Sequence, residues 1–543
     1  MTASPASSGP SSSSPLGDGP RDPEHHRNAS YALDLAYVAA LTSRIPSSGG
    51  RLRDHVSPLG NQPLGQVPQS EEADVDAAFV RARAAQRAWA LVPVAERERM
   101  LLRLHDVVLE RREEICEVIC LESGKSRKDA FLEVAHLAMT ARYYGRTSAD
   151  HLRSRRVPGM FPALTHVEVN QIPKGVVGII SPWNYPFTLA LCDGLPALAA
   201  GNAVVAKPDQ QTILTGLLGA ELLEQAGFPA DLWQVVSGAG ADVGTPMMAR
   251  ADYICFTGST ATGKKIAAQA AERLIGCSLE LGGKNPMLVL RDAPLERAAE
   301  GAVRGSFSNS GQLCISMERI FVADQVYDRF VERFVSRTQA LTLGASTAWE
   351  VDMGTLVSQA QLDTVEAHVA DAVAKGARVL TGGRARPDLG PYYYEPTVLE
   401  GVTPDMTCFA NETFGPLVSL YRFHDESEAV DRANDGLYGL NASIYTRDTK
   451  RGRMLARLLK AGTVNVNEPF GAAFGSLAAP MGGMRESGLG RRQGAEGILR
   501  YTETQSVGTQ HGPAITPPLG LSEEKYAAIM TTALKVLKKV GRA

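Results

Sequence analysis

The sequence has few cysteines, little net charge and no long apolar run. Seven cysteines are scattered through 543 residues, a small and odd number that argues against a disulfide framework and suits a reducing compartment. The formal net charge is -3 and no basic patch is present, which argues against binding to nucleic acid. No uninterrupted apolar stretch reaches the roughly 20 residues of a membrane span. We therefore expect a cytoplasmic protein without a membrane anchor.

The chain also lacks a secretory signal and a metal-binding cluster. Residues 1–30 are rich in Ser, Pro and Gly and have neither a positive start nor an apolar core, so we expect a disordered leader. Cys116 and Cys120 are four residues apart in a helical pattern, but no second Cys/His pair lies nearby. Buried helix-face cysteines are therefore a better interpretation than zinc ligands. We expect no metal site.

Alternation of strands and helices is the main pattern that is present. After a helical layer over residues 71–142, short apolar strands such as GVVGII and YICFTGS are each followed by a helix. This order predicts right-handed crossovers and parallel sheets covered on both faces, which is the α/β class with a doubly wound, Rossmann-like domain. A second strand–helix series from about residue 284 predicts a second α/β domain.

Two segments near the ends of this pattern differ from it. THVEVNQIP, near residue 165, alternates like an exposed strand, and YTETQSVGT, near residue 505, reads as a strand that returns to pair with it. The last stretch places Tyr526, Ile529 and Met530 on one face of an amphipathic helix. Packing of this helix on the body of the protein is the simpler interpretation, and a role at a membrane surface is the alternative.

Three segments carry candidate catalytic side chains. Asn184, in SPWNYPF, follows a strand, where its amide can face a developing oxyanion, although many such asparagines only shape turns. Glu280, in LELGGKNP, lies in an apolar run that raises a carboxyl pKa, as a general base requires; a salt-bridged strand end is the alternative. Cys314, in FSNSGQLCIS, lies in a polar turn whose amides would favour the thiolate over its usual pKa of about 8.5; a structural cysteine is the alternative.

A glycine-containing turn predicts a phosphate site. In FTGSTATGKK, Gly258, Ser259 and Gly263 surround the start of a helix, where phosphate oxygens bind readily. The same segment matches GxxxxGK, the front of a P-loop, but Lys265 stands where a magnesium-binding hydroxyl is needed. A second GKS sequence at Lys125 lacks the first glycine of that motif. A P-loop phosphotransferase is therefore disfavoured.

The order of these segments resembles the aldehyde dehydrogenase superfamily from about residue 60 to residue 510. Asn184 is followed by Lys207 in VVAKPD, the Gly-Ser turn, Glu280, Cys314 and then NETFGP at 411–416. The resemblance implies a Rossmann-like NAD(P)-binding domain, an α/β catalytic domain and a small β oligomerisation arm. Its expected parts are a leader (1–30), the NAD(P)-binding domain (31–156 and 176–283), oligomerisation strands (157–175 and 494–512), the catalytic domain (284–493) and a tail (513–543).

The resemblance assigns roles to the candidate catalytic residues. Cys314 would attack the aldehyde, and the Asn184 side chain with the Cys314 backbone N–H would hold the oxyanion of the thiohemiacetal. Glu280 would activate the water that hydrolyses the thioester to a carboxylic acid. The presence of Glu280 argues against the branch that releases its product to coenzyme A. Intact catalytic residues also argue against a silent structural relative.

The cofactor implied by the resemblance is NAD or NADP. A glutamate three residues after the strand lysine favours NAD in this family, whereas this chain has Gln210, which leaves both cofactors open. The predicted cofactor-binding residues are Trp183, Lys207, Gln210, Gly258, Ser259, Gly263, Glu412 and Phe414.

Substrate and assembly are the remaining expectations. The LELGGKNP and CISMERI segments resemble bacterial succinic semialdehyde dehydrogenases, which makes succinic semialdehyde the first candidate. Members of that branch hold the distal carboxylate with two arginines, and Cys192 and Ser308 occupy those positions here. An uncharged aliphatic or aromatic aldehyde is therefore the alternative. The family forms dimers or tetramers, so a homo-oligomer is expected.

Overall fold

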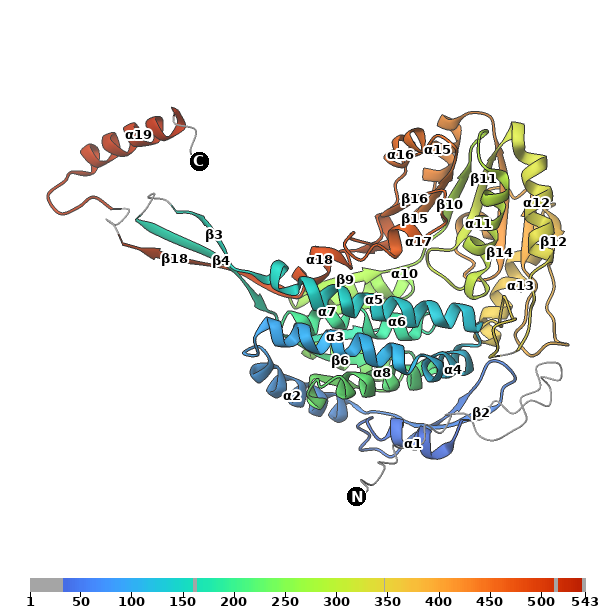
Figure 1. Ribbon diagram of the computed structural model, residues 1–543, viewed down its shortest axis with the longest axis horizontal. Helices are drawn as coiled ribbons and strands as arrows, with labels where there is room; N and C mark the ends of the chain where they lie inside the picture. The colour runs from blue at the N-terminus through green and yellow to red at the C-terminus, as the bar shows by residue number, and fades with distance from the viewer. Residues whose placement is uncertain (1–32, 160–163, 346, 512–515, 540–543) are drawn as a thin grey trace, which may run out of the picture.

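Two mainly parallel β-sheets form the body of the protein, and a narrow β-arm projects from it (Figure 1). The computed structural model describes residues 33–159, 164–345, 347–511 and 516–539. The predicted leader lies outside these residues. Within them, no helix is both long enough and apolar enough to cross a membrane. The α/β class predicted from strand–helix alternation is confirmed.

The first sheet has the strand order β17-β9-β8-β5-β6-β7 and is parallel except for β17. Chain order runs outward in both directions from the β5–β8 pair, so the sheet is doubly wound, as predicted. Its strands are β5 (Val176–Ile180), β6 (Ala203–Lys207), β7 (Trp233–Val235), β8 (Tyr253–Thr257), β9 (Gly276–Glu280) and β17 (Gly488–Leu489). Helices that follow them are α6 (Pro186–Leu191), α7 (Gly194–Ala199), α8 (Ile213–Gln225), α9 (Thr245–Arg250) and α10 (Thr260–Glu272).

A layer of helices precedes this sheet, as the periodicity over 71–142 predicts. Its members are α2 (Glu72–Trp89), α3 (Val94–Glu110), α4 (Arg112–Ser123) and α5 (Arg127–Leu152), after α1 (Leu35–Thr42), β1 (Leu52–Val56) and β2 (Pro63–Pro68). Gly124 ends α4 with a left-handed φ of 73°, and a Cβ there would lie 2.2 Å from Thr355. Ser126 then caps α5 by accepting a hydrogen bond from the Asp129 N–H. This turn contacts the second half of the chain, because the Gly124 carbonyl accepts a hydrogen bond of 3.0 Å from the Thr355 N–H.

The second sheet has the order β12-β13-β14-β11-β10-β15-β16, with only β12 antiparallel to its neighbour. Its strands are β10 (Asn285–Val289), β11 (Met317–Ala323), β12 (Arg378–Thr381), β13 (Thr397–Glu400), β14 (Leu417–Phe423), β15 (Asn441–Tyr445) and β16 (Thr463–Val466). Among its helices are α11 (Leu295–Phe307), α12 (Tyr327–Gln339), α13 (Gln359–Ala374), α15 (Glu426–Asn434) and α16 (Thr449–Ala456). The helix α18 (Gly494–Leu499), near the arm, packs on α5 and α7 beside the first sheet. Each large sheet has its own apolar core.

The arm is a three-stranded antiparallel sheet of order β18-β4-β3. Its strands are β3 (Arg155–Pro158), β4 (Thr165–Pro173) and β18 (Thr502–Gln510). The predicted return of the second alternating segment is confirmed, because β18 pairs with β4 along its whole length, from Thr502 opposite Pro173 to Gln510 opposite Thr165. All residues of β18 after Thr502 are exposed, so this edge of the arm is uncovered in the single chain.

The predicted amphipathic C-terminal helix is present as α19 (Glu523–Lys539). Its expected packing on the body of the protein is not found, because none of its described side chains is buried. Ile529, Leu534 and Val536 are each more than half exposed. Figure 1 shows the reason: α19 follows the arm in the chain and lies beyond it, away from the two large sheets.

Candidate active site

The predicted residues of the first sheet meet at one edge. Asn184 follows β5, Lys207 ends β6, Gly258 follows β8 and Glu280 ends β9. Because these four strands are parallel, their carboxyl ends share an edge, and ligands bind at such an edge in open α/β sheets. The sheet topology thus brings together residues that are nearly 100 positions apart in the chain.

Cys314 comes from the second half of the chain, in the loop between α11 and β11. Asn309, Ser310 and Gly311 all have left-handed backbone conformations, which reverse the chain after α11. The Cys314 carbonyl accepts a hydrogen bond of 2.8 Å from the Asn285 side chain. A Cβ on Gly283 would lie 2.5 Å from that carbonyl oxygen, so the glycine lets the turn after Glu280 approach the cysteine loop.

Asn184 is buried and linked to the same loop. Its Nδ2 donates to the Gln312 carbonyl at 3.1 Å, two residues before Cys314. Its own carbonyl oxygen accepts from Asn309 Nδ2 at 2.9 Å and from Lys125 Nζ at 2.6 Å. The Asn184 amide therefore lies beside the cysteine loop, as its predicted role requires.

Glu280 is buried, and its Oε1 has no hydrogen-bond partner among the described residues. Leu279 and Leu281 beside it are also buried, as the apolar run predicts. Burial raises the pKa of Glu280 to about 7, and the nearby Arg492 guanidinium opposes part of that rise. A carboxyl group with this pKa exchanges protons near neutrality, which is the property of a general base.

Cys314 departs from the predicted thiolate. Burial, together with the nearby carboxylates of Glu280 and Glu412, raises the pKa of the Cys314 thiol to about 12. The Ile315 backbone N–H lowers it, as the amide-rich turn suggests, but by less. In this state the thiol keeps its proton at neutral pH.

Residues 45–507 match the model of the family described as "Aldehyde dehydrogenase family". The chain belongs to the aldehyde dehydrogenase family. A Mycolicibacterium smegmatis protein named "Putative succinate-semialdehyde dehydrogenase", NADP(+), is 48% identical over 94% of this chain and 99% of that protein. The 4,4'-diapolycopene aldehyde oxidase of a Methylomonas species is 38% identical over 82% of this chain and 84% of its own. The NAD+ complex of Bacillus cereus aldehyde dehydrogenase superposes with a TM-score of 0.83, at 35% identity, over 87% of this chain and 98% of that chain.

Several predicted cofactor residues of this aldehyde dehydrogenase lie at or just after the carboxyl ends of β6 and β8. Ser259 caps the 13-residue helix α10, leaving first-turn N–H groups for phosphate oxygens. A Cβ on Gly263 would lie 2.5 Å from the Leu281 side chain, so this glycine brings α10 close to β9. Lys207 is buried and makes no ion pair within the described residues, and burial lowers its pKa. A buried ammonium without a carboxylate fits a ligand that brings oxygen atoms.

The remaining cofactor residues lie on the cysteine side. The Glu412 carboxylate accepts a 2.7 Å hydrogen bond from the Gly283 N–H, and burial raises its pKa to about 8. Trp183 and Phe414 meet edge to face with ring centroids 5.6 Å apart. These contacts join residues from the two sheets, as their shared predicted role requires.

Gln210 lies apart from that group, near the N-terminal hairpin. Its Nε2 donates to Gln69 Oε1 at 2.5 Å, and its carbonyl accepts from Arg53 at 3.0 Å. The glutamine side chain carries no charge, and the basic residue next to Gln210 is Arg53, which contacts its backbone carbonyl.

Three buried polar groups near the site were not singled out as functional from the sequence. Lys125 pairs with Glu133, and His136 contacts Cys192 Sγ at 3.5 Å from the same helix, α5. Arg492 pairs with Asp193 at 2.7 Å close to Glu280. Sequence patterns place all of these in ordinary helices or turns, and only tertiary contacts bring them to the site.

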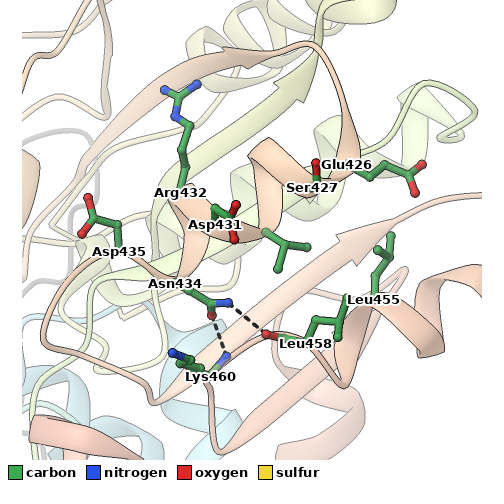
Figure 2. A pocket seen from close by; sticks show the side chains of 10 residues that line it. Glu426, Ser427, Asp431, Arg432, Asn434, Asp435, Leu455, Leu458 and Lys460 are labelled. Carbon is green, nitrogen blue, oxygen red and sulfur yellow. Dashed lines mark hydrogen bonds between the residues drawn. The ribbon is translucent and has the colours of Figure 1, made fainter.

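A large groove lies elsewhere, between α15 and α16 (Figure 2). It encloses about 820 Å³ and is lined mostly by polar residues, among them Asp431, Arg432 and Lys460. Asn434 crosses its floor, donating to the Leu458 carbonyl at 2.9 Å and accepting from the Lys460 N–H at 2.7 Å. None of the predicted catalytic or cofactor residues lines this groove, so it offers no part of the chemistry.

Proposed function

We propose that this aldehyde dehydrogenase uses Cys314 as nucleophile, Glu280 as general base and Asn184 as an oxyanion donor. The observation that carries the proposal is the Glu280 carboxyl group, buried with a free oxygen and a pKa of about 7, whose charge acts on the Cys314 thiol. The overall reaction is oxidation of an aldehyde to a carboxylic acid, with NAD(P)+ as the oxidant.

The first step needs the thiol to lose its proton. Glu280 takes this proton, since the pKa of Cys314 is raised so far that the free thiolate is scarce at neutral pH. The sulfur then adds to the aldehyde carbon, and the carbonyl oxygen becomes an oxyanion. The Asn184 Nδ2 and the Cys314 backbone N–H stabilise that charge.

The second half of the reaction regenerates the cysteine. A bound NAD(P)+ would supply the hydride acceptor, and loss of hydride from the thiohemiacetal carbon would leave a thioester on Cys314. Glu280 first releases the proton it took from Cys314 to solvent, and it then removes a proton from water as the water oxygen adds to the thioester carbon. The carbon–sulfur bond then breaks, the carboxylic acid leaves, and the sulfur regains a proton.

We further propose that Gln210 permits NADP+ as well as NAD+. Its neutral side chain does not repel a 2′-phosphate, and Arg53 lies against its carbonyl. Gln210→Glu is expected to raise KM for NADP+ by about 10- to 100-fold and to change KM for NAD+ less than about threefold, because only the phosphate is repelled. Steady-state kinetics with both cofactors tests this. Gln211→Glu is the matched neighbouring control, and an equal effect of Gln210→Glu on both cofactors contradicts the proposal.

Succinic semialdehyde is the first substrate we propose. It is supported by the name of the Mycolicibacterium smegmatis relative, which aligns over nearly all of its own length. The position of Cys192 offers no fixed cation, but His136 lies next to it. Burial lowers the pKa of His136 to about 3, so the imidazole is neutral until an anion stabilises its protonated form.

An uncharged, apolar aldehyde is the second candidate. Phe470, Phe474 and Tyr185 pack with Cys314 against a small apolar cluster, and Phe474 stacks on His136 at 4.2 Å. The Methylomonas relative is named 4,4'-diapolycopene aldehyde oxidase, and that name indicates an aldehyde substrate of another kind. An aromatic lining and a neutral histidine favour such substrates.

The two candidates separate in one comparison. If a group near Cys192 binds the carboxylate, kcat/KM for succinic semialdehyde should exceed that for pentanal, an uncharged aldehyde of similar length, by about 10- to 100-fold, since hydrogen bonds to charged groups contribute about 1.5–3 kcal/mol. His136→Phe should remove that preference and leave pentanal oxidation within about threefold. NAD(P)H absorbance measures both rates, and a preference for pentanal in the unaltered protein excludes the first candidate.

We also propose the domain roles, assembly and location expected from the sequence. Residues 31–156 and 176–283 form the NAD(P)-binding domain, residues 284–493 form the catalytic domain, and the segment Gly488–Leu489 adds a strand to the former. The exposed edge of β18 supports a homo-oligomer, a dimer or tetramer, built through the arm. The scattered free cysteines support a cytoplasmic location.

A further inference from the structure

Lys125 is a fully buried lysine whose only charged partner among the described residues is Glu133. Its Nζ lies 2.6 Å from Glu133 Oε1, and both side chains have no exposed surface. Taking two charges out of water opposes folding by several kcal/mol per ion before their attraction is counted, so such a pair is weak support for stability alone. A second contact indicates what else the pair does.

The ammonium group of Lys125 also donates a hydrogen bond to the backbone oxygen of Asn184. The Nζ–O distance is 2.6 Å, and the ammonium lies 3.9 Å from the centroid of the Tyr185 ring. Glu133 contacts the same segment, because its Oε2 accepts from the Thr188 N–H at 3.0 Å. The ion pair thus contacts the chain on both sides of the start of α6: Lys125 at Asn184 and Glu133 at Thr188.

The contact between Lys125 and the Asn184 backbone affects where the Asn184 side chain points. A hydrogen bond to the backbone carbonyl of Asn184 holds the peptide plane that follows its Cα, and so restricts the orientations open to its side chain. Asn309 donates to the same carbonyl, so this one oxygen links the turn to Lys125, just before α5, and to the cysteine loop. Charge-assisted hydrogen bonds are about twice as strong as neutral ones, which suits a lysine at this position.

We propose that Lys125 is a positioning residue that holds the Asn184 amide in register with Cys314. The inference rests on the proposed oxyanion role of Asn184. Lys125 itself touches neither substrate nor cofactor in this assignment. It acts through the Asn184 backbone, and Glu133 holds its charge in place.

A double-mutant cycle tests the coupling. Lys125→Met, nearly the same in shape but uncharged, is expected to lower kcat/KM by about 10- to 100-fold, since small misplacements of a catalytic group have effects of this size. Asn184→Ala is expected to lower it by about 100- to 1,000-fold. In the Asn184→Ala protein, adding Lys125→Met should then change the rate less than about threefold, because the group it positions is gone.

The controls separate this inference from the proposed function. Lys128→Met alters an exposed lysine three residues further along, in α5, that pairs with Asp352, and should change kcat/KM less than twofold. Cofactor Kd, followed by fluorescence, should stay within twofold in all variants. If Asn184→Ala keeps full activity, the oxyanion role is wrong. If Asn184→Ala is inactive as expected but Lys125→Met lowers the rate equally in both backgrounds, only the positioning role is wrong.

Glu133→Gln repeats the cycle in case Lys125→Met does not fold. It keeps an oxygen for Lys125 and removes the negative charge, so the expected loss of kcat/KM is smaller, about 3- to 10-fold. That loss should disappear in the Asn184→Ala background. A loss that persists there overturns the proposal.

Discussion

Replacing Cys314 with alanine is expected to lower aldehyde oxidation by about 10⁴-fold or more, because no other group in the site can form the covalent intermediate. The variant should still bind NADP+ with a Kd within about twofold of the original, since none of the cofactor residues changes. NAD(P)H absorbance with reduced protein measures the rate, and fluorescence titration measures the Kd.

Cys277→Ala is the matched control for that loss. Cys277 is a free, partly buried thiol on β9, three residues from Glu280, and makes no contact with the cysteine loop in the described structure. Its replacement should change kcat less than twofold. Full activity of Cys314→Ala, or equal losses in both variants, would show that the reaction does not pass through Cys314.

Replacing Glu280 with glutamine is expected to lower kcat by about 10²- to 10⁴-fold, the usual contribution of a general base. At pH 9, where a larger fraction of Cys314 is ionised, one equivalent of NAD(P)H should still form in a burst before the slow steady state. The burst reports thioester formation, and the low steady rate reports hydrolysis without a base. Rapid-mixing absorbance measures both, and Glu296→Gln, an exposed glutamate paired with Arg333, is the control.

The dependence of the rate on pH also tests Glu280 as the general base. The pKa of Glu280 is raised to about 7, so the carboxyl group is increasingly protonated below that pH and can no longer accept a proton. The rate of the unaltered enzyme should therefore fall about tenfold per unit as the pH drops below 7. Glu280→Gln should lack this decline. A rate that stays constant between pH 7 and pH 5 in the unaltered enzyme would exclude Glu280 as the base.

Local patterns were enough to predict most of the fold. Apolar strands followed by helices predicted the sheets because hydrophobic periodicity acts over a few residues. The packing of α19 was predicted wrongly because an amphipathic face shows that a surface needs covering, but not which surface covers it. The strand at Gly488 was missed because two residues are too short to form a pattern.

The candidate site, like the fold, was predicted in part from the sequence. Asn184, Glu280 and Cys314 stand out locally, but their roles were assigned from the order of the segments, which resembles the aldehyde dehydrogenase superfamily, and those roles stay predictions. The direction of the Cys314 pKa was predicted wrongly because Glu280 and Glu412, which raise it, come from distant segments. Lys125 was seen only as part of a failed P-loop motif, because its contact with Asn184 spans 59 positions in the chain.

The pairing of β17 with β9 has a consequence for the making of the protein. Gly488 lies opposite Glu280, and the Leu281 N–H donates to the Ser487 carbonyl at 2.9 Å. The backbone at Glu280 is thus held by residues that are synthesised more than 200 positions later in the chain. Domains generally fold from the N-terminus during synthesis, so the first sheet can assemble early while its catalytic edge stays open. Under the proposed assignment, a nascent chain can therefore form the predicted cofactor-binding edge well before the β17 segment is available to hold the end of β9 at Glu280.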